Sequence, residues 1–237
     1  MEKTFRKDYL DLNMFRGLGE DPAYHLPTLT DRPRAWPMNR WAEAPRDLGF
    51  NDFTNCQWKG LRLLKDPATQ SAYHNLLWEI RPRTIIELGI YSGASLVWFR
   101  DITKLLGIDC NVIGVDKNLG RSQIPESERD HISLLEGDCS VPSSLEPLRD
   151  MIKHPLLVID DAHCNTFNVM AWAVAHLLER GDYFIIEDMI PYWERYSPKL
   201  LAEYLGSFQG VLEMDMIYAN TCPQLDRGVF RRSDVEQ

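Results

Sequence analysis

Short apolar runs alternate with longer amphipathic stretches along the chain from Asp66 onward. The short runs are rich in Ile, Val and Leu and are apolar on both faces, which is typical of parallel strands covered by helices. The expected strands are residues 84–87, 112–116, 132–135, 156–160, 183–187, 212–218 and 228–231. The expected helices are residues 69–80, 94–106, 144–152, 166–178 and 198–208. This pattern predicts an α/β protein with a doubly wound, Rossmann-like sheet of seven strands.

The last two expected strands are joined by a loop with no helix between them. Parallel neighbours need a long crossover connection, whereas antiparallel neighbours do not. We therefore expect residues 212–218 and 228–231 to form an antiparallel pair at one edge of the sheet.

The first 65 residues differ from the rest of the chain. They contain a concentration of prolines and tryptophans, at Pro22, Pro27, Pro33, Trp36, Pro37, Trp41, Pro45 and Trp58. Prolines at this density oppose a long helix, and several exposed tryptophans would be costly in water. We expect an N-terminal arm, residues 1–65, that packs on its own domain or on a neighbouring subunit of a homo-oligomer. A single α/β domain, residues 66–237, would follow it.

Composition narrows the class of protein. The 237 residues include 26 basic and 35 acidic side chains, and the net charge of −9 repels nucleic acid and anionic membranes. No apolar stretch approaches the roughly 20 residues that cross a bilayer, and the N-terminus lacks the apolar segment of a secretory signal. The five cysteines are scattered without a C-x-x-C pair, so neither a zinc site nor a disulfide framework is expected. We expect a cytoplasmic protein with no membrane or nucleic-acid partner.

Acidic residues end almost every expected strand. They are Glu87, Asp116, Asp138, the pair Asp160 and Asp161, and the pair Glu187 and Asp188. Ligands of open α/β sheets bind beyond the carboxyl ends of the strands, so these acids should converge on one crevice. Any one of them could be a helix cap or a surface charge. Their recurrence at strand ends favours a binding site.

The first expected strand runs into ELGIYSGAS, residues 87–95, a glycine turn that opens a helix. Gly89 and Gly93 let the backbone approach a ligand closely, and the helix N-terminus offers free N–H groups. Glu87 and Ser95 complete the motif as candidate binding residues. The spacing is not G-x-G-x-x-G, so the dinucleotide fingerprint and its support for hydride transfer are absent.

Two further acids point to a nucleoside ligand. Asp116 ends the second strand, where a carboxylate can accept both hydroxyls of a ribose. Asp138 follows the third strand, where an acid could meet an adenine amino group. A plain tight turn at residues 87–95 is the alternative interpretation, but together with the two acids the glycine turn favours cofactor binding.

The glycine turn, the acid that closes the second strand and the terminal hairpin resemble the class I S-adenosylmethionine-dependent methyltransferases. More narrowly, the chain resembles the cephalosporin hydroxylase family, the component of cephamycin biosynthesis involved in 7α-methoxylation. The resemblance runs nearly end to end, through DLNMFRGLGEDPAYH, RWAEAPRDLGF, VIDDAHCNTFN, YFIIEDMIPYWERY and QLDRGVFRR. It implies a methyltransferase domain, S-adenosylmethionine binding, a magnesium site of clustered carboxylates, and an oligomer held partly by the N-terminal arm.

A metal site also follows from the carboxylates themselves. Asp161, Glu187 and Asp188 close neighbouring strands, and three bare carboxylates so close together repel one another unless a cation or protons intervene. Oxygen ligands favour Mg²⁺, or Ca²⁺ in a roomier site, over zinc. Strand alternation leaves open whether Asp160 or Asp161 binds the ion. The resemblance implies that Asp161 binds the metal ion and that Asp160 belongs to the cofactor-binding residues. The alternative to a metal site is a cluster of carboxylates that arginines neutralise through salt bridges.

His163 follows Asp161 closely and is the candidate catalytic residue. It could take a proton from a substrate hydroxyl, orient a metal ligand, or serve only as a hydrogen-bonded structural residue. Tyr192, Trp193 and Tyr196 follow the last acidic pair and could wall an acceptor pocket, although aromatic runs are commonly packing.

The expected function is Mg²⁺-dependent transfer of the methyl group of S-adenosylmethionine to the 7α-hydroxyl of a cephalosporin. Hydroxylation would belong to a separate 2-oxoglutarate-dependent partner protein. Two alternatives remain: the chain could itself be the C-7 hydroxylase component, or it could be a non-catalytic, cofactor-binding subunit of a two-protein system.

Overall fold

The computed structural model describes residues 56–189 and 198–233, and a seven-stranded sheet of order β5-β4-β3-β6-β7-β9-β8 forms its centre. The strands are β3 (Thr84–Leu88), β4 (Asn111–Asp116), β5 (Ile132–Glu136), β6 (Leu156–Asp160), β7 (Tyr183–Ile186), β8 (Leu212–Met214) and β9 (Val229–Arg232). Strands β3 to β7 are parallel, and β9 runs antiparallel to both of its neighbours. The predicted α/β class, the seven strands and the antiparallel edge are confirmed.

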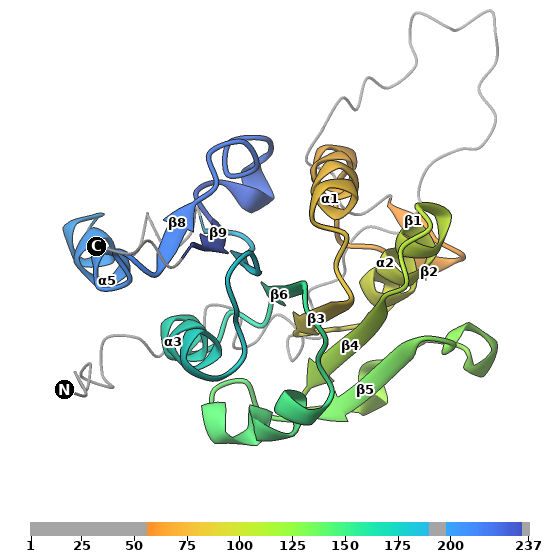
Figure 1. The fold of residues 1–237 in the computed structure, drawn as a ribbon. Coiled ribbons are helices and arrows are strands. Elements are labelled where there is room, and N and C mark those ends of the chain that lie inside the picture. The colour runs from red at the N-terminus through yellow and green to blue at the C-terminus, as the bar shows by residue number, and fades with distance from the viewer. Residues whose placement is uncertain (1–55, 190–197, 234–237) are drawn as a thin grey trace, which may run out of the picture.

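Helices cover both faces of this sheet (Figure 1). Helices α1 (Pro67–Ile80) and α2 (Ala94–Leu105) lie on one face, and α3 (Thr166–His176) and α5 (Pro198–Gly206) lie on the other. Alternate strand residues feed the two cores: Ile85 and Ile159 pack toward α1 and α2, whereas Ile86 and Val158 pack toward α3. This two-sided burial is why the strands read as continuous apolar runs.

Two predicted elements differ from the structure. The expected helix 144–152 is the 3₁₀ segment η7 (Pro142–Asp150), because Pro147 inside it cannot donate an α-helical hydrogen bond. The expected strand 212–218 stops at Met214. Asp215 then turns the chain, since its Oδ1 accepts from the Ile217 N–H at 3.0 Å and its carbonyl accepts from the Ala219 N–H at 2.8 Å. Short 3₁₀ turns η5 (Leu119–Arg121), η6 (Glu126–Glu128) and η8 (Pro223–Leu225) complete the described loops.

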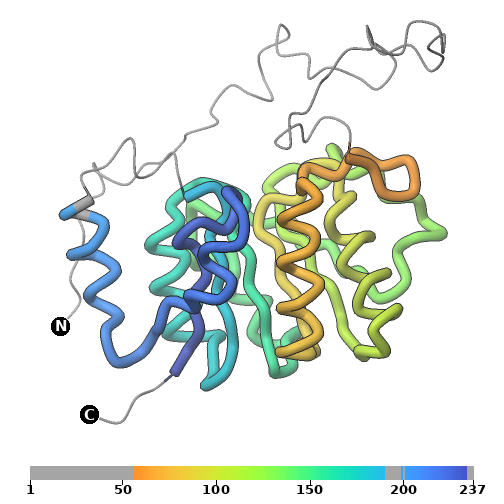
Figure 2. The backbone as a smooth tube through the Cα atoms, turned by 90° about the horizontal axis from the view of Figure 1, so that it is seen from above, coloured from red at the N-terminus to blue at the C-terminus, as the bar shows by residue number. Residues whose placement is uncertain are grey.

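A small hairpin that the sequence pattern did not predict precedes α1. Its strands are β1 (Gln57–Trp58) and β2 (Leu61–Arg62), and Figure 2 shows it, in orange, at the end of the molecule where α1 begins. Trp58 Nε1 donates to Asp101 of α2 at 2.8 Å, and Leu61 and Leu63 are buried in the core shared by α1 and α2. Trp58, Leu61 and Leu63 of the predicted N-terminal arm therefore pack on the α/β domain. The prolines and other tryptophans of the predicted arm lie outside the described residues.

Two expectations about composition can be compared with the structure. Across residues 56–189 and 198–233, no helix has both the length and the apolar character that spanning a membrane requires. All five cysteines are free thiols.

Candidate active site

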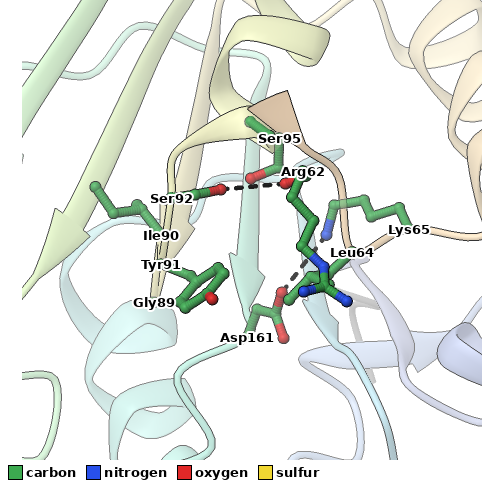
Figure 3. A pocket seen from close by; sticks show the side chains of 10 residues that line it. Arg62, Leu64, Lys65, Gly89, Ile90, Tyr91, Ser92, Ser95 and Asp161 are labelled. Atoms are coloured by element: carbon green, nitrogen blue, oxygen red, sulfur yellow. Dashed lines mark hydrogen bonds and ion pairs between the residues drawn. The ribbon is translucent and has the colours of Figure 1, made fainter. Parts of the chain in front are cut away.

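An open pocket lies at the point where the strand order reverses, between β3 and β6 (Figure 3). It is lined by the turn between β3 and α2 and the first residues of α2, by Arg62 of β2, by Leu64 and Lys65 after the hairpin, and by Asp161 after β6. The Asp161 N–H donates to the Leu88 carbonyl at 2.9 Å, so the two strand ends are joined directly. Such switch points are where open α/β sheets bind ligands.

The glycine turn brings backbone to this pocket. Gly89 has φ +86°, and a Cβ built on it would lie 2.7 Å from the Ala162 Cα, so only glycine fits against the loop that follows β6. Gly93 is the N-cap of α2 with φ +81° and supplies no side-chain cap. The first N–H groups of α2 are therefore left for a ligand.

Glu87 and Ser95, the two other candidate residues of the motif, contact each other. Glu87 is fully buried, and its Oε2 accepts a short hydrogen bond from the Ser95 hydroxyl. Burial raises the pKa of Glu87, and the nearby Lys65 ammonium opposes that rise. Ser95 lines the pocket. Glu87 lies behind the turn and forms an ion pair with Lys65, whose Nζ is 3.2 Å from Glu87 Oε1.

Asp116 and Asp138 end neighbouring strands, as predicted. Asp116 Oδ2 accepts from the Ile90 N–H at 3.2 Å, which links the end of β4 to the glycine turn. Asp138 is exposed, and its Oδ1 accepts from the Ser140 N–H at 2.9 Å and hydroxyl at 2.6 Å, which lowers its pKa. Both carboxylates lie at the carboxyl ends of the parallel strands, on the side of Gly89 where β4 and β5 are found.

Asp160 and Asp161 have separate surroundings. Asp160 is 1% exposed and bonds its own loop through the Ala162 N–H at 3.1 Å, and burial raises its pKa to about 6. Asp161 keeps 25% of its side chain exposed and lines the pocket. Of the pair, Asp161 is the one that meets the other acids.

Four carboxylates and two cationic side chains meet here, and we call them the acidic cluster. Its members are Glu87, Asp161, Glu187, Asp188, Lys65 and His163. His163 Nε2 lies 3.1 Å from Asp161 Oδ1 and 3.7 Å from Asp188 Oδ2. The potential ligand atoms of these three residues all lie within 4.8 Å of one another, so they could hold one metal ion.

Glu187 lies deeper than the other two predicted metal ligands. It has no exposed surface, and Lys65 Nζ contacts both of its carboxylate oxygens, at 2.7 and 2.8 Å. The hydroxyl of Tyr73 on α1 also donates to Glu187 Oε1. Asp161 and Glu187 both contact Lys65 Nζ, at 3.6 and 2.7 Å, whereas Asp188 is linked to Asp161 through His163.

Burial is the largest influence on the pKa values of the acidic cluster, and the neighbouring charges modify it. Burial and the neighbouring Asp161 raise the pKa of Glu187 to about 8, although Lys65 opposes the rise, and they raise that of Asp188 to about 6. Burial would lower the pKa of His163, but its hydrogen bond to Asp161 prevails and raises it to about 9. Burial would raise the pKa of Asp161, yet Lys65 and His163 hold it below its usual value. A further cation would relieve this repulsion.

Three residues in and beside the acidic cluster have strained backbone conformations. Tyr91, His163 and Asp188 all adopt the left-handed conformation, with φ of 47°, 53° and 54°. Such conformations are costly for side chains other than glycine and persist where the surrounding structure enforces them. The Asp188 N–H, for example, is held by the Gln224 carbonyl at 2.8 Å. Contacts of this kind hold the strained backbone at Asp188 in place beside the acidic residues.

Sequence reasoning missed Lys65 and Tyr73. The start of α1 could be read from Asp66 and Pro67, since Asp66 Oδ1 caps the helix through the Thr69 N–H at 2.8 Å. Nothing in the local pattern marked Lys65, one residue earlier, as buried. Tyr192, Trp193 and Tyr196 lie outside the described residues.

The sheet order, the antiparallel edge and a ligand site at the switch point together define a Rossmann-like methyltransferase fold. A family model described as Rhamnosyl O-methyltransferase/CmcI matches residues 51–192. The chain belongs to this family.

Relatives agree with the assignment. A solved structure of CmcI with Mg and SAM is 67% identical, has a TM-score of 0.81, and covers 96% of this chain and 97% of its own. An apo structure of CmcI is 66% identical with a TM-score of 0.80 and the same coverage. The rhamnosyl O-methyltransferase of Mycobacterium leprae (strain TN) is 26% identical over 171 residues, which are 67% of this chain and 74% of the relative. Its counterpart in Mycobacterium bovis (strain BCG / Pasteur 1173P2) is 25% identical over 142 residues, and the match spans 58% of that relative.

Proposed function

We propose that this protein transfers the methyl group of S-adenosylmethionine to the 7α-hydroxyl of a cephalosporin, with Mg²⁺ as its metal. The family and the fold make it an S-adenosylmethionine-dependent O-methyltransferase, and the Mg and SAM complex of CmcI supports both cofactors. The observation that carries the proposal is the acidic cluster beside the glycine-turn pocket. The cephalosporin acceptor rests on the family resemblance.

The donor set fits a hard divalent ion. We propose Asp161, Glu187 and Asp188 as the metal ligands. Asp161 and Asp188 keep 25% and 33% of their side chains exposed, and Asp161 lines the pocket, while Glu187 has no exposed surface. Carboxylate oxygens are the ligands Mg²⁺ prefers. Four carboxylates against the two cations Lys65 and His163 leave an excess of two negative charges when all are ionised, which a divalent ion would balance.

S-adenosylmethionine would bind along the carboxyl-terminal edge of the sheet, from β6 to β5. Gly89, Gly93 and Ser95 would hold the methionine portion close to the backbone, Asp116 would bind the ribose hydroxyls and Asp138 the adenine amino group. Glu87 supports the turn from beneath and Asp160 supports the loop that carries Asp161. The contact between Gly89 and Ala162 sets the two halves of the site side by side.

When bound, S-adenosylmethionine supplies an electrophilic methyl group and Mg²⁺ lowers the pKa of an acceptor hydroxyl. The chain's own contribution is to orient the acceptor and to manage its proton. His163 Nε2 lies beside both Asp161 and Asp188. It can receive the hydroxyl proton only in its neutral form, which its raised pKa of about 9 opposes near neutral pH, or it can hold Asp161 in place by donating a hydrogen bond. If His163→Gln lowers kcat and leaves Mg²⁺ affinity unchanged, His163 receives the hydroxyl proton. If the variant lowers Mg²⁺ affinity, His163 holds Asp161 in place.

The test is methyl transfer by the purified full chain with S-adenosylmethionine, Mg²⁺ and 7α-hydroxycephalosporin, followed by mass spectrometry. We expect a mass gain of one methylene that requires Mg²⁺ and is lost in Asp188→Asn. If the methyl group were transferred only to a rhamnosyl glycoside, the proposed cephalosporin acceptor would be wrong and the acceptor would be a sugar. No transfer to either would overturn the catalytic assignment in favour of a cofactor-binding subunit.

The partner and assembly proposals have tests of their own. If the protein acts on a 7α-hydroxyl, a separate 2-oxoglutarate-dependent hydroxylase must supply that hydroxyl. The chain alone should then leave an unsubstituted cephalosporin unchanged, whereas hydroxylation by the chain alone would make it the C-7 hydroxylase. Light scattering of the full chain and of a chain lacking residues 1–55 would test whether the N-terminal arm holds a homo-oligomer.

A further inference from the structure

A lysine is buried at the centre of the acidic cluster. Lys65 is 1% exposed, and its Nζ contacts carboxylates from the ends of three strands: Glu187 after β7, Glu87 on β3 and Asp161 after β6, at 2.7, 3.2 and 3.6 Å. Figure 3 shows the Lys65 ammonium and the Asp161 carboxylate pointing toward one another. The lysine enters from the segment between β2 and α1, outside the sheet.

The carboxylates form two layers with respect to solvent. Glu87 and Glu187 have no exposed surface and form the inner layer, whereas Asp161 and Asp188 are partly exposed to solvent and form the outer layer. Charges in the inner layer cannot be stabilised by water, so they need a partner within the protein. Lys65 is the cation that contacts both inner carboxylates in the described structure, and Tyr73 adds a hydrogen bond to Glu187.

We propose that Lys65 is a built-in counter-ion of the acidic cluster, whose ammonium holds Glu187 in the metal-free protein and competes with the divalent ion for it. Lys65 thereby sets the affinity for Mg²⁺ and keeps the cluster stable without metal. This role rests on the proposed magnesium site. It makes Lys65 a positioning residue that acts through Glu187 and Asp161.

The size of the effect follows from the geometry. Lys65 Nζ lies 3.6 Å from Asp161 Oδ2. Since Mg²⁺ binds oxygen at about 2.1 Å, an ion on that oxygen would be less than about 6 Å from the ammonium. Even with the dielectric constant of water, repulsion between a unit charge and a dication at this distance changes affinity by about tenfold. Removing the charge should therefore tighten Mg²⁺ binding by about tenfold or more.

The experiment compares wild type with Lys65→Met, Lys65→Arg and the control Lys59→Met. Lys59 is an exposed lysine that pairs with Asp101 and Glu128. Isothermal titration gives the Mg²⁺ affinity, and thermal unfolding in EDTA and in saturating Mg²⁺ gives stability. We expect Lys65→Met to bind Mg²⁺ about tenfold more tightly, to melt at lower temperature in EDTA, and to recover much of that loss in Mg²⁺. Lys65→Arg, which keeps the charge, should bind Mg²⁺ as wild type does, and Lys59→Met should change neither readout.

The outcomes separate this role from a purely structural one. An equal loss of melting temperature with and without Mg²⁺, at unchanged affinity, would overturn the counter-ion role while leaving the metal site intact. Absence of Mg²⁺ binding in wild type would overturn the metal site and the role of Lys65 together. If Lys65→Met does not fold, the ¹⁵N-labelled lysine ammonium of wild type provides the test: its resonance should shift on addition of Mg²⁺, and an unmoved resonance would refute the proposal.

Discussion

Gly89→Ala is the sharpest test of how the site is assembled, because Gly89 is where the turn after β3 meets the loop after β6. The glycine has φ +86°, and its nearest neighbours across the contact are backbone atoms: a Cβ would lie 2.7 Å from Ala162 Cα and 2.8 Å from the Asp161 carbonyl oxygen. Both distances are well below the 3.4 Å at which ordinary contact begins, and backbone cannot move aside as a flexible side chain can.

Two costs add at this position. A non-glycine residue in the left-handed region costs roughly 1–2 kcal/mol, and forced overlap in a packed site costs about 1–3 kcal/mol more. Gly60, at the tip of the hairpin, isolates the first cost, because it has φ +79° and a Cβ added there would meet no atom within 4 Å. We expect Gly60→Ala to lower the free energy of unfolding by about 1–2 kcal/mol and Gly89→Ala by about 2–5 kcal/mol.

Urea unfolding in EDTA measures both losses, and isothermal titration measures Mg²⁺ affinity. Because the overlap pushes on the loop that carries Asp161, Gly89→Ala should also weaken Mg²⁺ binding, whereas Gly60→Ala should not. Equal losses of stability in the two variants, with Mg²⁺ binding intact, would refute the close contact between the two loops.

Other substitutions divide the site into its parts. Tyr73→Phe removes the hydroxyl that donates to buried Glu187 and should lower the free energy of unfolding by about 1.5–3 kcal/mol in urea titrations. Tyr183→Phe is the matched control, because its hydroxyl bonds a partly exposed carboxylate and should cost less than about 1 kcal/mol. Asp116→Asn should weaken S-adenosylmethionine binding and leave Mg²⁺ affinity unchanged, and Asp188→Asn should do the reverse; titration of each variant with each ligand would reveal any departure from this division.

Much of the fold could be predicted because its elements are local. Strands β3, β4, β5 and β6 begin and end within one residue of their predicted bounds. Strands β3, β4 and β6 are short apolar runs buried on both faces, whereas β5 is a partly exposed edge strand. The errors have local causes as well. Pro147 was visible in the sequence and accounts for the 3₁₀ geometry of η7, and the Asx turn at Asp215 ends β8 early.

The acids of the candidate site and His163 were predictable, whereas Lys65 and Tyr73 were not. Asp161, Glu187 and Asp188 each follow a strand, and strand ends in a parallel sheet meet at one edge, so their convergence follows from the pattern. Lys65 and Tyr73 reach Glu187 across 122 and 114 residues of sequence, from a segment that lies outside the sheet. No periodicity relates residues so far apart.

The sequence by itself determined the alternation of strands and helices, the glycine turn and the acidic strand ends, because these depend on side-chain periodicity and on single residues such as Gly89. Only the tertiary structure decided the strand order, the separation of Asp160 from Asp161, and the layering of the carboxylates around Lys65. These features depend on which surfaces are buried against each other once the chain has packed, and burial determines how strongly each charge needs a partner.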